Sequence, residues 1–260
     1  MRRLVFTALL LLLSTAASAK ELSETIDRTF DVKPGATVSL SNVNGSVTVN
    51  AWDQPRVRVV AVKTVKADAD VVAAALKELR VELQPRNGGL DVTTRYPKRT
   101  DGISSIFDWL TGDHVDAQVK YELTVPRSMT LDLETVNGGI RVQDVNGKHE
   151  IETTNGRIEL TRCAGSVDAT TTNGGIEAEL TTVAKGQPLR FETTNGRIEV
   201  TVPQTLAVDV DAATTNGAIK SDLPITTTRF DKNSLKGTIN GGGTSLHMRT
   251  TNGGISIRTR

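Results

Sequence analysis

Charged side chains recur at fixed positions in the second half of the chain, where paired carboxylates and guanidinium groups could do acid–base chemistry. Arg157 and Arg197 stand at one position of a repeated motif, and Glu159 and Glu199 follow them by two residues. Further carboxylates in the same region are Glu152, Glu177, Glu179 and Glu192. Such groups on one sheet face would suit a polysaccharide lyase or hydrolase, but general acid–base catalysis needs a perturbed pair within a cleft. We expect solvated strand positions instead and keep the enzyme as an alternative.

The other reactive side chains form no recognisable catalytic or metal-binding set. The three histidines are His114, His149 and His247, far apart in the sequence, and Cys163 is the only cysteine. The sequence contains no zinc-protease, nucleophile-elbow, paired-cysteine or phosphate-loop motif. We therefore predict no catalytic residue, no metal and no cofactor. We expect His149 to be a surface or strand residue and Cys163 to be a small buried hydrophobe.

One segment, residues 97–116, interrupts every pattern and concentrates apolar side chains. Tyr96 precedes it, and the segment contains Ile103, Ile106, Phe107, Trp109 and Leu110. An exposed apolar patch can bind a glycan, a membrane or a protein partner, whereas a folded-back loop can cover the open end of a sheet. Tyr96, Phe107 and Trp109 are the residues that we predict to contact a partner if the loop is exposed.

The elements that would position all these residues are short strands in a repeat. The motif IETTNGRIEL at residues 151–160 recurs, in variant form, from Thr170, Phe191, Ala213 and Arg249. Within each copy aliphatic residues alternate with polar ones, as in a strand with one buried face. The spacing of the copies gives a period of about 18–22 residues. The stretch 213–248 has the length of two such units and contains a degenerate copy, TINGGG.

Two architectures fit the repeated Asn-Gly pairs. As two-residue hairpin turns they would place Glu152 opposite Glu159, and like charges directly opposite destabilise a strand pair. As corners of a solenoid they would stack asparagine on asparagine, and units of unequal length would keep the motif in phase. We favour the solenoid, an all-β, single-stranded β-helix with coils of about 18–22 residues. Its expected turn residues are Asn137, Asn155, Gly156, Asn173, Gly174, Asn195, Gly196, Asn216, Gly217, Asn252 and Gly253.

Glycine in these turns has an expected physical reason. A positive φ angle, which many tight turns need, costs a residue with a β-carbon about 1–2 kcal/mol. We therefore expect the Asn-Gly pairs to adopt positive φ.

The rest of the chain divides into a leader, a less regular strand-rich part and the repeats. A basic pair, an apolar run and an Ala-Ser-Ala site predict a secretory signal peptide over residues 1–19. Residues 20–130 contain one predicted helix, at 68–80, which Asp68 or Asp70 would cap and which would cover an end or side of the sheet. Residues 131–260 carry the repeats and are expected to continue the same solenoid.

Charge and cysteine content exclude some classes of function. The chain has 31 basic and 30 acidic residues, and the signal peptide contains two of the basic ones. A nearly neutral chain lacks the basic face expected of a nucleic-acid-binding protein. A single cysteine cannot form an intrachain disulfide. After the signal peptide no segment approaches about 20 apolar residues, so we predict no transmembrane segment in the mature chain.

The order of the segments resembles a bacterial family. VNGSVTVNAWD, a helical piece, YELTVP, LDLETVNGGI and the recurring TTNGxI follow one another between Phe30 and Arg260. This order is similar to that of the bacterial putative-adhesin family, an exported β-strand-repeat domain of unknown function related in style to adhesin-head β-helix domains. The resemblance implies a stacked-strand fold at the cell envelope, linked in some members to envelope stress or surface attachment. It brings no catalytic residues to transfer.

Together these observations predict an exported, non-enzymatic binding, adhesin-like or scaffold protein, located in the periplasm, at the cell surface or outside the cell. Its partner would be an envelope glycan or an envelope protein rather than nucleic acid. Self-association through end strands is a further alternative, because unpaired strand edges readily add strands.

Overall fold

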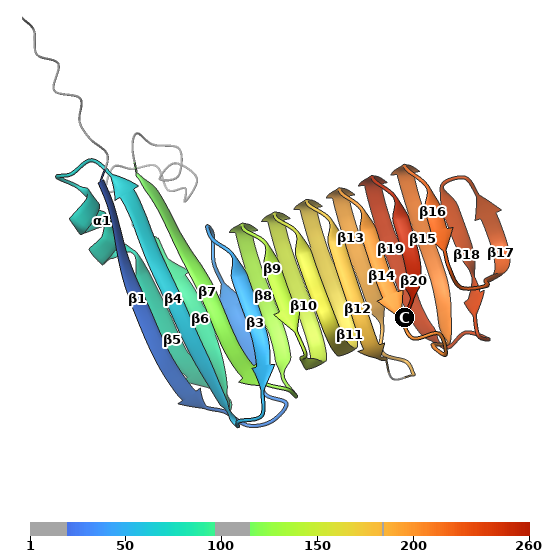
Figure 1. Ribbon diagram of the computed structural model, residues 1–260, viewed down its shortest axis with the longest axis horizontal. Helices are drawn as coiled ribbons and strands as arrows, with labels where there is room; N and C mark the ends of the chain where they lie inside the picture. The colour runs from blue at the N-terminus through green and yellow to red at the C-terminus, as the bar shows by residue number, and fades with distance from the viewer. Residues whose placement is uncertain (1–19, 97–114, 184) are drawn as a thin grey trace, which may run out of the picture.

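The computed structural model describes residues 20–96, 115–183 and 185–260, most of which belong to β-strands. The strands lie side by side along the long axis of the molecule (Figure 1). They form two layers around one core, which we call layer A and layer B, and β11 (Ile158–Asn173) passes through a corner and pairs in both. The predicted signal peptide, residues 1–19, and residues 97–114 of the predicted loop lie outside the described residues.

Layer A contains the strands that lead into the Asn-Gly corners, with further strands at each end. In their order along the molecule they are β5 (Arg80–Arg86), β6 (Gly89–Arg95), β2 (Thr37–Ser41), β8 (Thr130–Asn137), β10 (Asn146–Asn155), the second half of β11, β13 (Leu189–Asn195), β19 (Thr244–Asn252), β15 (Val208–Asn216), β18 (Ser234–Ile239) and β17 (Thr226–Asp231). Pairing is parallel from β6 to β15 and antiparallel at both ends.

Layer B contains the strands that follow the Asn-Gly corners, with antiparallel strands added at one end. In order they are β1 (Lys20–Asp31), β4 (Arg56–Ala67), β7 (Asp116–Pro126), β3 (Val47–Trp52), β9 (Ile140–Gln143), the first half of β11, β12 (Ile176–Thr182), β14 (Ile198–Val202), β20 (Ile255–Thr259) and β16 (Ile219–Ser221). Strand β7 begins at Asp116, so the predicted loop extends one residue too far.

Parallel pairing between successive coils confirms the predicted solenoid. Thr153 of β10 lies in register with Thr135 of β8 and Thr171 of β11. Glu152, which a hairpin would place against Glu159, instead lies beside Glu134 and a threonine. The aliphatic residues that alternate along each strand fill the core between the layers, as Ile158 and Leu160 do.

The coils do not stack in sequence order at either end. The coil formed by β19 and β20 lies between the β13–β14 coil and the β15–β16 coil (Figure 1). Likewise the β2–β3 coil lies between the strands β6 and β7 and the β8–β9 coil. Residues 213–248 have the length of two repeat units but do not form two coils, because β17 and β18 form an antiparallel hairpin beside β15.

The one helix of the described residues, α1 (Val72–Glu78), packs against β1 and β4 at one end of the stack. It is shorter than the predicted 68–80, because Leu79 is already extended and Arg80 opens β5. Neither Asp68 nor Asp70 caps it through a side chain. Nζ of Lys63 lies 3.1 Å from the carbonyl oxygen of Leu79 and 2.6 Å from a carboxylate oxygen of Glu24, where a cation is favourable at the helix C-terminus.

Candidate functional site

The Thr-Thr-Asn-Gly corner is the most regular feature of the sequence. Its side chains form hydrogen bonds that hold neighbouring coils together. The hydroxyl of Thr153, which is buried, donates to the carbonyl oxygen of Gly138 in the preceding coil at 2.9 Å. The same bond recurs in the other coils, from Thr171 to Gly156, Thr193 to Gly174, Thr250 to Gly196 and Thr214 to Gly253. Each of these bonds satisfies a partly buried backbone carbonyl of the neighbouring coil.

Asparagine side chains form a continuous ladder along the corner. The Nδ2 atom of each donates to the Oδ1 atom of its neighbour at 2.8 Å. In spatial order the ladder is Asn44, Asn137, Asn155, Asn173, Asn195, Asn252 and Asn216. The structure therefore places all the predicted turn asparagines at one corner, with Asn252 ahead of Asn216.

The glycines of the corner are required for close approach of the backbone. A β-carbon on Gly156 would lie 2.0 Å from the carbonyl oxygen of Gly138, and on Gly174 or Gly196 it would meet the neighbouring coil at 1.9 Å. The positive φ that we expected is not found at Gly156, Gly174 or Gly196. Our physical reason for these glycines was wrong, although the structure places them at the corners.

The outer face of layer A carries a group of five neighbouring carboxylates. We call Asp132, Glu134, Glu150, Glu152 and Asp168 the acidic patch. Asp132, Glu150 and Asp168 lie in register on adjacent strands, as do Glu134 and Glu152. With Thr170 and Arg190 they line a shallow depression of about 440 Å³. Like charges at neighbouring positions repel one another, so the patch weakens the fold unless cations balance it.

Only part of the acidic patch is balanced within the described residues. Lys148 contacts Glu150 at 2.6 Å, and Arg190 contacts Asp168 at 3.7 Å. No described cation pairs with Asp132, Glu134 or Glu152. Burial, followed by repulsion from Glu150, raises the pKa of Asp132 above its ordinary value. Burial also raises the pKa of Asp168, with Arg190 opposing it.

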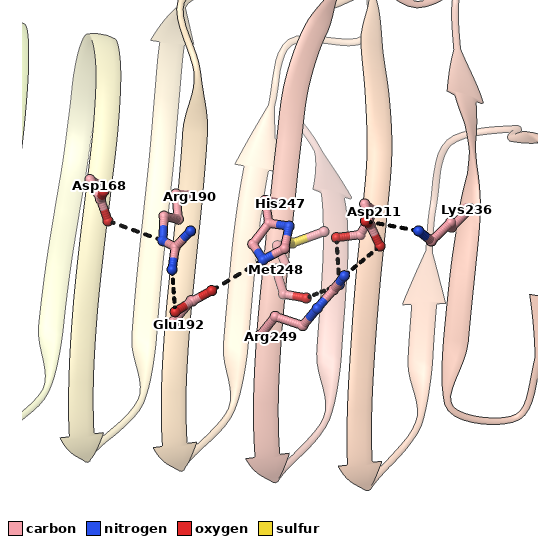
Figure 2. A network of polar contacts seen from close by, with 8 residues as sticks. All are labelled: Asp168, Arg190, Glu192, Asp211, Lys236, His247, Met248 and Arg249. Carbon is pink, nitrogen blue, oxygen red and sulfur yellow. Dashed lines mark hydrogen bonds and ion pairs between the residues drawn. The ribbon is translucent and has the colours of Figure 1, made fainter.

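Beside the acidic patch, charges of both signs alternate across the strands (Figure 2). Arg190 links Asp168 to Glu192, and the imidazole of His247 contacts Glu192 at 3.1 Å. The carboxylate of Asp211 lies 2.7 Å from the guanidinium of Arg249 and 3.2 Å from Nζ of Lys236. Burial would raise the pKa of Asp211, but the two cations outweigh it and the pKa is lowered. This half of the face is therefore internally neutralised.

The predicted enzymatic residues come together only in part. Arg157, Arg197, Glu177 and Glu199 line a depression of about 330 Å³ over Gly175, which lies between the two arginine-bearing coils. Glu159 is instead held by Arg141 at 2.6 Å and by Arg157 at 3.4 Å. Burial alone would raise the pKa of Glu159. The two arginines outweigh burial and hold this pKa below its ordinary value, so the carboxyl stays ionised. A general acid would need the opposite shift.

Tyr96 is the predicted partner-binding residue that the structure describes. Its hydroxyl lies within the fold, at 3.1 Å from Oδ1 of Asn42, and accepts the backbone N–H of Asn44 at 2.9 Å. Burial raises the pKa of the phenol to about 12. Phe107 and Trp109 lie outside the described residues, so partner binding by these aromatic residues remains a prediction.

Sequence reasoning missed the buried polar network to which Tyr96 belongs. Asn42 accepts the hydroxyl of Thr94 at 2.8 Å and donates to the carbonyl oxygen of Val119 at 3.0 Å. Thr94 in turn contacts the hydroxyl of Tyr121 at 2.7 Å. Asn42 takes the position that a threonine occupies in the other coils, two residues before the corner asparagine, and this exception was the available signal.

Two residues considered for chemistry are buried within the core. His149 lies on β10, as a strand residue, but is fully buried rather than on the surface, because its column is the inward one of Leu131 and Val167. Cys163 is buried, and burial raises the pKa of its thiol to about 11, which leaves it protonated and unreactive. No group of three or more metal-ligating side chains gathers anywhere in the described ranges.

Comparison with known proteins gives a family and a set of distant structures. The model of the family Toastrack DUF4097 matches residues 23–258. A putative cell adhesion protein from Clostridium sporogenes is 10% identical, with a TM-score of 0.44 over 91% of this chain and 100% of that one. A putative adhesin from Bacteroides fragilis is 11% identical, with a TM-score of 0.32 over 90% and 97%. A putative lipid binding protein from Parabacteroides distasonis is 12% identical, with a TM-score of 0.23 over 91% and 94%. No curated protein matches the chain.

Proposed function

Because the chain belongs to the Toastrack DUF4097 family, we propose that it is an exported, non-enzymatic protein of the cell envelope that binds a partner in an adhesin-like or scaffolding role. The predicted signal peptide supports export, and the putative adhesins among the similar structures have names consistent with attachment. The stacked coils supply a long, regular outer face on which side chains from many strands act together. Among the described residues, no helix is long and apolar enough to cross a bilayer.

The observation that carries this proposal is the acidic patch. Asp132, Glu134 and Glu152 stand on two adjacent strands of the outer face, and no cation of the described residues forms an ion pair with any of them. A partner bearing amines or basic side chains would remove their mutual repulsion on binding, and this gain would weaken as salt screens the charges. An envelope glycan with amino groups and a basic segment of an envelope protein both meet this requirement.

The binding proposal is tested with polysaccharide columns that differ only in charge. Purified protein is passed over amine-bearing, neutral and acidic polysaccharides and over immobilised polylysine, at low and high salt. We expect retention on the amine-bearing supports that falls with salt. The triple variant Asp132→Asn, Glu134→Gln, Glu152→Gln should lose this retention.

A matched variant removes the same charge from elsewhere. Asp70→Asn, Glu78→Gln and Glu122→Gln neutralise three exposed carboxylates outside the patch and should leave retention unchanged. Equal retention by both triple variants, or equal retention on the neutral support, would contradict a role for the patch. A reporter joined to residues 1–19 and found in the cytoplasm would contradict export.

The enzyme alternative rests on the depression between Arg157 and Arg197. It predicts that acidic polysaccharides incubated with the protein give shorter products, and that the double variant Arg157→Ala, Arg197→Ala gives none. Products from both proteins, or from neither, would exclude catalysis at this place. Products that disappear in the double variant would overturn the non-enzymatic proposal.

A further inference from the structure

We call Thr244–Arg260 the inserted coil. Its strand-pairing partners all lie well before it in the sequence. In layer A, β19 pairs with β13 on one side and β15 on the other. In layer B, β20 pairs with β14 and β16 in the same way. Strands from residues 189–202 and 208–221 therefore form a slot, and the inserted coil fills it.

The side-chain bonds of the inserted coil cross both seams of this slot. Asn252 donates to Asn195 and accepts from Asn216, each at 2.8 Å. Figure 2 shows a hydrogen bond between His247 and Glu192 on one side and an ion pair between Arg249 and Asp211 on the other. Because every one of these partners lies outside the inserted coil, the slot of a second copy offers the same bonds.

A glycine-rich segment connects the inserted coil to the hairpin before it. Asn240, Gly241, Gly242 and Gly243 have φ angles of 50°, 84°, 79° and 143°. The segment crosses the start of β15, where Nδ2 of Asn240 donates to the carbonyl oxygens of Gln204 and Leu206. Glycines reach both signs of φ at little energetic cost, so this connection can also open into an extended form.

An empty slot would not be stable by itself. If the inserted coil leaves, β13, β14, β15 and β16 each lose a parallel neighbour and expose unpaired N–H and C=O groups in the middle of the molecule. Unpaired edges of this kind take up another strand, and the strand of matching shape is the same coil from another molecule.

We propose that the inserted coil Thr244–Arg260 exchanges between two copies of this chain, with Asn240–Gly243 as the hinge, and that the product is a two-fold dimer in which each copy fills the slot of the other. The exchange differs from association through end strands, because the crossed seams lie inside the ladder. It is also independent of the acidic patch and of the proposed binding function.

The test uses cysteines on the two sides of one seam. Glu192 and Arg249 are register partners on β13 and β19, and neighbouring strands lie about 4.8 Å apart, a separation that a disulfide can span. One chain carries Glu192→Cys and the other Arg249→Cys, both with Cys163→Val, since Val145 occupies the equivalent buried position. The two chains are unfolded together, refolded at high concentration and oxidised.

We expect a disulfide-linked dimer containing one chain of each kind. The same two chains mixed without unfolding should give little of it within the same time. A single chain carrying both cysteines should form the bond within a monomer when refolded at low concentration, which shows that the geometry permits it. If this bond forms within the monomer but no mixed dimer appears after joint refolding, coil exchange is excluded.

The hinge is tested by a matched pair of glycine variants. Gly241 and Gly35 have φ angles of 84° and 75°, and a β-carbon at either would have no heavy atom within 4 Å. Gly241→Ala strains only the closed hinge, so the dimer fraction should rise about tenfold relative to the unsubstituted chain. Gly35→Ala imposes the same strain on a distant turn and should leave the fraction unchanged. An equal effect of both would overturn the hinge assignment.

Discussion

At the scale of single residues, the corner shows how one motif serves three purposes. The first threonine satisfies a partly buried carbonyl, the asparagine extends a ladder, and the glycine lets two backbones approach within contact distance. Each purpose depends on the neighbouring coil rather than on the residue's own turn. The repetition of the motif therefore follows from stacking, since every coil must offer the next coil the same hydrogen-bonding groups and the same close backbone contact that it meets in the previous one.

Gly174 and Gly175 are adjacent in the sequence but differ in how closely the neighbouring backbone approaches them. A β-carbon on Gly174 would lie 1.9 Å from a backbone oxygen, whereas on Gly175 its nearest neighbour would be 3.2 Å away. Gly175 also takes the position of Arg157 and Arg197, so this position accepts a side chain. We expect Gly174→Ala to lower the free energy of unfolding by about 3 kcal/mol or more and Gly175→Ala by less than about 1 kcal/mol. Urea unfolding measures both, and equal losses would refute the argument.

Stability should depend on pH through His149. Burial lowers the pKa of this imidazole in the folded state, while in the unfolded chain it takes up a proton below about pH 6.5. As the pH falls through that range the unfolded state binds more protons, so the free energy of unfolding decreases. Between about pH 7.5 and 5.5, His149→Leu should lose about 1 kcal/mol less than the unsubstituted chain. Parallel losses in the two proteins would show that His149 does not contribute.

At the scale of elements, the two ends of the stack are closed by different means. At one end α1 and the antiparallel strands β1, β4 and β5 complete the core, and at the other the β17–β18 hairpin lies against β15. Strand edges are further blunted by charge and proline, with Arg80, Pro85 and Arg86 on β5. These features oppose the simple end-to-end association considered from the sequence.

The attachment of α1 should depend on Lys63. Its Nζ contacts two carbonyl oxygens at the end of the helix and the carboxylate of Glu24, and its side chain is only 6% exposed. Lys63→Met keeps the length of the side chain but leaves these acceptors without a cation, so we expect a loss of about 1–3 kcal/mol in the free energy of unfolding. Lys66→Met, on the exposed face of the same strand, should cost less than about 0.5 kcal/mol. Thermal unfolding would compare them, and similar losses would contradict the role of Lys63.

At the scale of the whole molecule, the inserted coil connects β15–β18 to the rest of the stack. Strand β15 pairs only with β18 and β19, and β16 only with β20, among the described strands. Among the described strands, pairing therefore joins residues 208–239 to the main stack only through the inserted coil. A remnant of three strands, β15, β17 and β18, lies at the lower limit of strand number for an independently stable sheet.

Removal of residues 244–260 tests this arrangement. In the shortened chain we expect hydrogen exchange at 208–239 to approach that of an unfolded segment, while 130–200 keeps its protection. A chain shortened further, to end at Val202, should unfold at nearly the same temperature, because 203–243 no longer contributes. Retained protection at 208–239 would contradict the pairing scheme.

Much of this architecture could be predicted from the sequence. The alternation of Ile158, Leu160 and their equivalents fixed the buried faces, and the regular Asn-Gly pairs required corners that stack in phase. These features are local or repeat at short range, so spacing alone reveals them. The acidic residues of the outer face could likewise be placed from their alternation with the aliphatic ones.

Only the tertiary structure decided the order of the coils and the surroundings of single side chains. All Asn-Gly corners are nearly alike, so any coil could stack on any other by its motif, and the sequence could not show that Asn252 lies between Asn195 and Asn216. The order of the coils is linked to strand direction. Strand β18 pairs antiparallel with one edge of β15, and the next strand in the chain, β19, pairs parallel with the other edge. The inserted coil therefore lies on the far side of β15 from the hairpin. Burial of His149, pairing of Glu159 and the lack of an ion pair at Asp132 among the described residues are likewise properties of neighbours that are distant in the chain.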